Sequence, residues 1–184
     1  MTEPAASTVL VEKSKVEYGR GIIAGLLAGF VWAFVTAIGI AIVVQLYHDK
    51  IVAYVQPRIL PPQPLLPGFP ELGSTTPPTA DQLIQQAVGM ATASIFFVGL
   101  ISGPVLGIVF AWLEKSYGGN RDIMRNSILF SLLADMLYVL IQLAPPTSPL
   151  GNEARIFGAT FSLLSASAAG IVLGAAYKRL TTIL

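Results

Sequence analysis

Apolar residues fall into four long stretches along the chain, separated by polar or proline-rich segments. The stretches cover about residues 21–46, 87–112, 123–143 and 156–177. Each holds 21 to 26 residues, and a helix needs about 20 residues to cross a hydrocarbon core of roughly 30 Å. The pattern therefore predicts an all-α fold in which four transmembrane helices form the bundle of a polytopic membrane protein.

Composition agrees with a membrane environment. Hydrophobic residues make up 54% of the chain and charged residues 11%, whereas soluble domains carry about 25% charged residues. The net charge of +1 creates no field that attracts nucleic acid. The chain has no cysteine, which excludes disulfides and thiolate metal sites. We therefore expect contact with the lipid bilayer and none with nucleic acid.

Lysine and arginine are distributed unevenly between the ends of the four stretches. Eight of the 11 precede the first stretch, separate the second from the third, or follow the fourth: Lys13, Lys15, Arg20, Lys115, Arg121, Arg125, Lys178 and Arg179. The opposite ends have only Lys50, Arg58 and Arg155. Because basic residues near span ends stay in the cytoplasm, we expect a multi-pass cell-membrane protein with both termini cytoplasmic.

The segments outside the spans divide the rest of the chain. Residues 1–16 mix small, polar and charged types, which indicates a mobile cytoplasmic tail before a single four-helix membrane domain at 17–184. Residues 47–79 form the expected extracytoplasmic loop between the first and second helices. At its end, Thr79 and Gln82 have the spacing of a capping box that opens the second helix.

The extracytoplasmic loop is rich in proline and also apolar. Four of its prolines recur every three residues and, with one phenylalanine, form a candidate partner-docking loop: Pro61, Pro64, Pro67, Phe69 and Pro70. This spacing is the period of a polyproline II helix. The segment that starts at Arg58 also fits the arginine-led pattern that SH3-type grooves bind. We favour a stiff strap over the bundle, since the expected topology places the loop on the wrong side for such domains.

Small residues recur at four-residue spacing in three of the stretches. The candidate helix-packing glycines are Gly21, Gly25 and Gly29 in the first, Gly99, Gly103 and Gly107 in the second, and Gly158, Gly170 and Gly174 in the fourth. Such ridges let helix backbones approach closely in lipid. They fit either an interface with a partner or packing inside the bundle, and we favour the second. The third stretch has no glycine, so we expect it to supply the side chains that fill these grooves.

One aspartate interrupts the third stretch. Asp135 lies twelve residues beyond Ile123, roughly 18 Å along a helix. A carboxyl group at this depth must face the bundle or a wet cavity, and desolvation without a counter-charge favours the neutral acid. Residues at matching depth in the other stretches define a candidate intramembrane polar cluster: Asp135, Ser165, Ser162, Thr36 and Ser102.

Two roles fit this carboxyl group. It either takes up a proton or a cation during transport, as intramembrane carboxylates do, or it hydrogen-bonds a serine and fixes helix register. His48, the only histidine, fits a solvated residue at a helix end better than a metal ligand. No set of catalytic, phosphate-binding or dinucleotide-binding residues can be assembled. We therefore expect no enzyme, no cofactor and no metal site.

The first functional hypothesis is a non-catalytic subunit, or an accessory or assembly factor, of a larger membrane complex. The small-residue ridges and the apolar proline loop motivate it, because both suit other membrane subunits or self-association. The alternative is a small transporter or transporter component that uses Asp135 as an intramembrane proton- or cation-binding carboxylate.

Overall fold

The computed structural model describes residues 5–59, 78–117, 122–143 and 151–183. Its elements are α1 (Ala5–Leu46), α2 (His48–Val55), the 3-10 helix η1 (Gln56–Arg58), α3 (Ala80–Tyr117), α4 (Ile123–Leu143) and α5 (Gly151–Ile183). Every element in these ranges is helical. The helices α1, α3, α4 and α5 are long and apolar enough to cross a membrane, which confirms the prediction of an all-α protein with four candidate spans.

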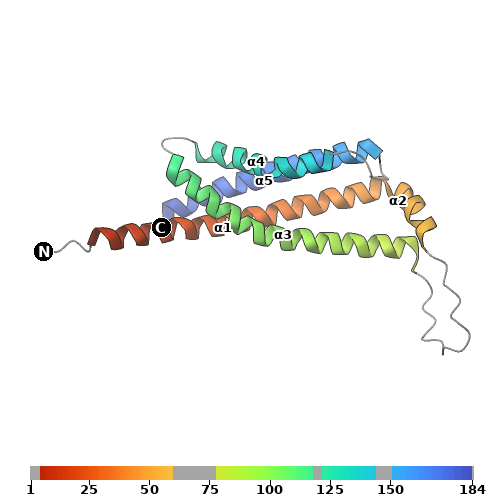
Figure 1. Ribbon diagram of the computed structural model, residues 1–184, viewed down its shortest axis with the longest axis horizontal. Helices are drawn as coiled ribbons and strands as arrows, with labels where there is room; N and C mark the ends of the chain where they lie inside the picture. Colours follow the sequence, from red (N-terminus) through yellow and green to blue (C-terminus); the bar gives the residue numbers. More distant parts are fainter. Residues whose placement is uncertain (1–4, 60–77, 118–121, 144–150, 184) are drawn as a thin grey trace, which may run out of the picture.

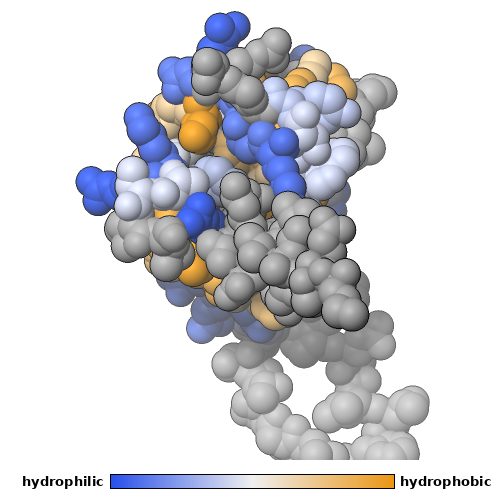
Figure 2. All heavy atoms as spheres, turned by 90° about the vertical axis from the view of Figure 1, so that its left-hand side faces the viewer, coloured by the Kyte–Doolittle hydropathy of each residue, from blue (hydrophilic) through white to orange (hydrophobic). Residues whose placement is uncertain are grey.

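The four long helices pack as a bundle in two layers (Figure 1). The helix α1 packs against both α3 and α5, and α4 packs against α5. The end of α3 and the start of α4 lie at one end of the bundle, on the left in Figure 1. We call this the basic end, because the exposed Lys115, Arg125, Lys178 and Arg179 lie there. Figure 2 looks onto it and shows hydrophilic side chains gathered around smaller apolar patches.

The contact between α1 and α3 is made by backbone against backbone. Three glycines of each helix meet in antiparallel order, Gly21 with Gly107, Gly25 with Gly103 and Gly29 with Gly99. A Cβ atom on any of them would overlap a carbonyl oxygen of the opposite glycine. The ridges of the first two spans therefore fill one another inside the bundle, as the internal-packing interpretation expects.

The small-residue ridge of the fourth span, α5, is filled by side chains and backbone of α4. The expectation that the third span fills all three ridges was wrong. A Cβ atom on Gly170 would overlap the backbone of Ile128, and one on Gly174 would overlap the Ser127 hydroxyl. The third span, α4, therefore fits the groove of α5, as expected. It does not fill the grooves of α1 and α3, because their glycines already occupy each other's space. Gly158 is half-buried in α5.

Local signals in the sequence account for the helix starts. The Thr79 hydroxyl accepts from the backbone N–H of Gln82 at 3.3 Å, and the Gln82 side chain accepts from the Thr79 N–H at 3.0 Å. This pair is the predicted capping box. The N-terminus of α4 is capped by Asp122, whose carboxylate accepts from the Met124 N–H at 3.0 Å.

The segment after α1 contains a helix that the sequence analysis assigned to a loop. The chain turns at Tyr47 and forms α2, whose Ile51, Val52 and Val55 are half-buried while Asp49 and Lys50 are exposed. The helix packs against α3 and α1. The proposed docking residues of the proline loop lie outside the described residues. The helix α1 begins at Ala5, within the segment expected to be a mobile tail, whose mobility stays a prediction.

The glycine contact predicts a paired result for two substitutions in α3. Gly103→Ala should lower the free energy of unfolding in detergent micelles by about 1–3 kcal/mol, because the new methyl group forces α1 and α3 apart. Gly89→Ala is the matched control, since nothing lies within 4 Å of the position that its Cβ would take. It should leave stability unchanged or raise it by up to about 1 kcal/mol. Equal effects of the two substitutions would contradict the tight contact.

Candidate functional site

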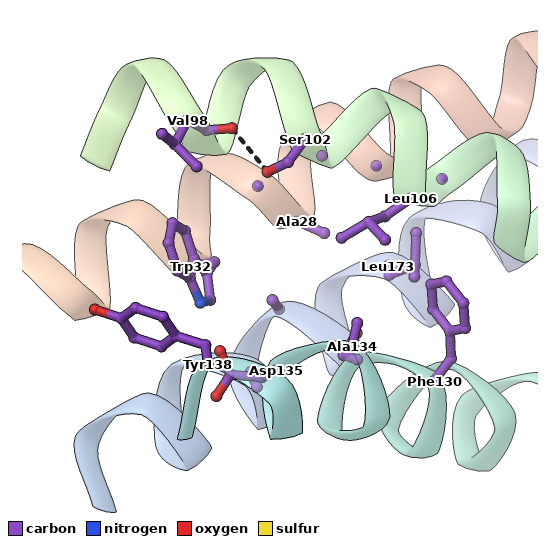
Figure 3. Close-up of a pocket in the computed structure, with 17 residues that line it drawn as sticks. Ala28, Trp32, Val98, Ser102, Leu106, Phe130, Ala134, Asp135, Tyr138 and Leu173 are labelled. Atoms are coloured by element: carbon purple, nitrogen blue, oxygen red, sulfur yellow. Dashed lines mark hydrogen bonds between the residues drawn. The ribbon is translucent and has the colours of Figure 1, made fainter. Parts of the chain in front are cut away.

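A cleft of about 310 Å³ lies among the four candidate spans, and all four long helices contribute to it. Its wall includes seven small residues: Gly25, Gly29, Gly103 and Gly107 of the α1–α3 contact, and Ala28, Ala166 and Ala169. Larger side chains project into it from α1, α3, α4 and α5, as Figure 3 shows. Because so many wall residues are small, the helices leave space between them even though they pack closely.

Three aromatic rings pack together towards the basic end, and one of them, Phe130, lines the cleft. Phe110 of α3 is almost completely buried, at 1% exposure. Its ring centroid lies 5.7 Å from that of Phe130 in α4 and 5.5 Å from that of Tyr177 in α5. Near these rings, the Asn126 side chain donates to Glu114 at 2.7 Å and links α4 to α3.

Beyond this contact the helices α3 and α4 separate. Figure 1 shows α3 changing direction where it crosses α1, while α4 continues beside α5. Pro104, inside α3, follows Gly103 at this crossing, and proline removes one helical hydrogen bond and promotes a bend. On one side, the cleft is therefore bordered by α3 and α4, two helices that touch mainly at the basic end.

Asp135 lies at the end of the cleft away from the aromatic rings. Asp135 is 8% exposed. Its carboxyl group accepts a hydrogen bond of 2.6 Å from the Ser162 hydroxyl of α5. Trp32 of α1 lines the same end of the cleft and lies beside this carboxyl group, as Figure 3 shows. The carboxyl group thus joins α4 to α5 by a hydrogen bond and faces Trp32 of α1 at the same depth.

The other members of the predicted polar cluster lie near Asp135 to different degrees. Ser165 is fully buried, but its hydroxyl donates to the backbone carbonyl of Ser162 at 2.7 Å. Ser102 lines the cleft and donates to the Val98 carbonyl of its own helix at 2.7 Å. Thr36 Oγ1 is buried without a hydrogen-bond partner in the described part of the chain. Of the predicted cluster, Ser162 alone bonds Asp135 directly.

Two aromatic residues at this end were absent from the predicted cluster. Trp32 and Tyr138 both line the cleft with Asp135, as Figure 3 shows. Tyr138 lies three positions after Asp135 and therefore on the same helix face, a signal that the sequence contained. Trp32 lies one turn from Thr36, and depth matching alone did not decide which of the two faces Asp135.

The chemistry available in the cleft is limited to one carboxyl group, hydroxyls and aromatic rings. Of the described residues that line it, Asp135 is the one carboxylic acid, and no lysine, arginine or histidine is among them. Among the described residues, no group of three or more histidine, cysteine, aspartate or glutamate side chains is placed to hold a metal ion. The arrangement suits binding of a proton or of a single positive charge.

Comparison with known proteins does not assign the chain to a family. No family model matches the chain, and no curated protein and no solved structure is significantly similar to it. A functional interpretation therefore depends on the geometry of the cleft.

The Asp135 hydrogen bond predicts different outcomes for two serines of α5. Ser162→Ala should lower the free energy of unfolding by about 0.6–2 kcal/mol, because a carboxyl group buried in the bundle loses its partner on α5. Ser167→Ala should have a smaller effect, since that hydroxyl donates to the Leu163 carbonyl of its own helix at 2.8 Å. Both values are measured by denaturant titration in micelles. A Ser162→Ala protein as stable as the parent would rule out a structural contribution from this bond.

Proposed function

We propose that the chain is a small membrane transporter, or a component of one, that binds a proton or cation at Asp135. The observation that carries this proposal is the position of Asp135 at the cleft. The carboxyl group borders a space that another molecule can occupy, instead of being enclosed entirely by neighbouring helices. A carboxyl group needed only to fix helix register has no requirement for such a space.

The energetic argument points the same way. An aspartate at the centre of a span costs about 2.5–3.5 kcal/mol on insertion scales. A hydrogen bond such as the one from Ser162 returns about 0.6–2 kcal/mol in a membrane protein. The bond therefore does not offset the insertion cost, and a role in transport supplies a reason for an acid at this depth.

The proposal includes an orientation in the membrane. The basic end, with Lys115, Arg125, Lys178 and Arg179, is the cytoplasmic end in this proposal, because such residues are retained inside. Both termini are then cytoplasmic, and α2 lies at the extracytoplasmic surface. Asp135 is roughly 18 Å from the start of α4, near the middle of the membrane.

The hypothesis of an accessory subunit stays a second candidate, and one observation favours it. The helices α3 and α4 meet mainly through Phe110 and Phe130 and through Glu114 and Asn126, so one side of the bundle stays open. A further membrane subunit or a second copy of the chain fits this side. The glycine ridges no longer support this candidate in α1 and α3, since they are used internally.

Asp135→Asn is the central test of the transport proposal. The amide keeps the size of the side chain and the ability to accept from Ser162, but it cannot ionise at ordinary pH. In proteoliposomes, proton- or cation-coupled flux should fall to the background of empty vesicles. Yield and elution volume on size-exclusion chromatography should match those of the parent.

Ser162→Ala provides the control for this test, because it removes the hydrogen bond and keeps the carboxyl group. It should retain measurable flux. If Asp135→Asn transports as well as the parent, or if it loses only stability, Asp135 has no transport role and the accessory candidate is favoured.

The orientation is tested by labelling single cysteines, which the cysteine-free chain allows without background. Gln56→Cys, exposed beyond α2, should react with a membrane-impermeant maleimide added to intact cells. Ser116→Cys, exposed near the end of α3, should react only after the membrane is permeabilised. The reverse pattern would mean that both termini are extracytoplasmic.

A further inference from the structure

We propose that the cleft between α3 and α4 binds a lipophilic organic cation, with its positive group beside Asp135, Trp32 and Tyr138 and its apolar body along the helices. This inference rests on the proposed role of Asp135 and names the class of substrate. It follows from the unequal distribution of polar and apolar side chains along the cleft, which Figure 3 displays.

The end at Asp135 has the features that recognise an organic cation. A carboxylate supplies the counter-charge, and the faces of tryptophan and tyrosine attract ammonium groups, most strongly where water is excluded. Trp32 and Tyr138 both line the cleft beside this carboxyl group. No described basic residue in the lining competes for the carboxylate. The charge of a ligand bound here is therefore positive.

An inorganic metal ion fits this end poorly. Calcium takes six to eight oxygen ligands and magnesium needs a nearly octahedral set. Here the one described side chain that hydrogen-bonds the carboxyl group is the Ser162 hydroxyl, and no described group of three or more histidine, cysteine, aspartate or glutamate side chains could hold a metal ion. Aromatic rings cannot replace a hydration shell of oxygen atoms. They can contact the methyl or methylene groups around an ammonium nitrogen.

The rest of the cleft suits an elongated apolar group. Leu106, Phe130 and Leu173 line it towards the basic end, where Figure 3 shows them away from Asp135. Lining residues of α3 extend from Val98 to Gly107, and nine helical steps span about 14 Å. The glycines of α1 and α3 have no side chains to fill this length. A chain or ring system parallel to the helices fits the space.

Access from the bilayer follows from the separation of α3 and α4. A lipophilic cation partitions into the membrane, and the open side of the bundle lets it reach Asp135 without passing the packed aromatic rings near the basic end. In this proposal Asp135 is the neutral acid before the cation binds, because a carboxylate without a counter-charge is costly in an apolar surrounding. Binding of the cation then converts the acid to a carboxylate paired with the cation. The released proton passes to water, one proton for each cation bound.

Binding is tested in lipid nanodiscs with octyltrimethylammonium and its neutral isostere 2,2-dimethyldecane. The chain has two tryptophans, so a Trp112→Phe background leaves Trp32 as the fluorescence reporter inside the cleft. The cation should change Trp32 emission saturably and release about one proton per bound molecule, measured with a pH dye in weak buffer. The isostere should bind at least about tenfold more weakly, a difference equivalent to about 1.4 kcal/mol.

Two substitutions and one control locate the ligand. Asp135→Asn should weaken cation binding by about tenfold or more and abolish proton release, because the counter-charge is gone. Tyr138→Leu should weaken it by roughly twofold to thirtyfold through loss of the ring face. Tyr117→Leu, at an exposed aromatic residue outside the cleft, should change nothing. Tyr138 is itself 45% exposed, so its substitution tests the site even if Asp135→Asn fails to fold.

The outcomes separate this inference from the proposed function. Equal binding of the isostere, or cation binding that survives both substitutions, overturns the inference. Asp135-dependent flux of protons or sodium without binding of the organic cation also overturns it, while the proposed function stands. Cation binding through Asp135 without any flux in proteoliposomes supports the ligand class and contradicts transport by this chain alone.

Discussion

The backbone contact between α1 and α3 is the constraint on which the rest of the structure depends. Without side chains at Gly25 and Gly103, the two helices approach until the backbone of one contacts the backbone of the other. In lipid, where burial of apolar surface gives little driving force between helices, such contact supplies much of the attraction. The register of the glycines also fixes how far one helix slides along the other.

The open cleft is a consequence of this contact. Once α3 is held against α1, it meets α4 mainly at the basic end, where Phe110 packs against Phe130. Figure 1 shows α3 running obliquely away from α4 up to the bend at its crossing of α1, and apart from α4 beyond it. The same contact places glycines in the wall of the cleft, so close packing of one helix pair leaves room for a ligand beside it. This space allows a ligand to contact Asp135, since the hydrogen bond from Ser162 satisfies only part of its carboxyl group.

Much of the fold was predictable from local pattern. Apolar stretches of sufficient length predicted the four long helices, and the spacing of Thr79 and Gln82 predicted the start of α3. Sequence reasoning failed at α2, because eight residues next to a proline-rich segment resembled its continuation. Sequence reasoning also expected α4 to fill the grooves of all three other spans, whereas it fills only that of α5. A ridge of small residues does not reveal whether another ridge or a large side chain fills it.

The sequence by itself determined the four long apolar helices and the position of Asp135 along the third of them, because length, hydropathy and helical rise are properties of one segment at a time. Tertiary structure decided which side chains of the other helices lie next to the Asp135 carboxyl group. Depth matching named both Ser162 and Thr36, yet the rotation of each helix about its axis brings Ser162 and Trp32 to the carboxyl group and leaves Thr36 aside. That rotation is set by contacts between helices, above all by the glycines of α1 and α3, and no single segment contains it.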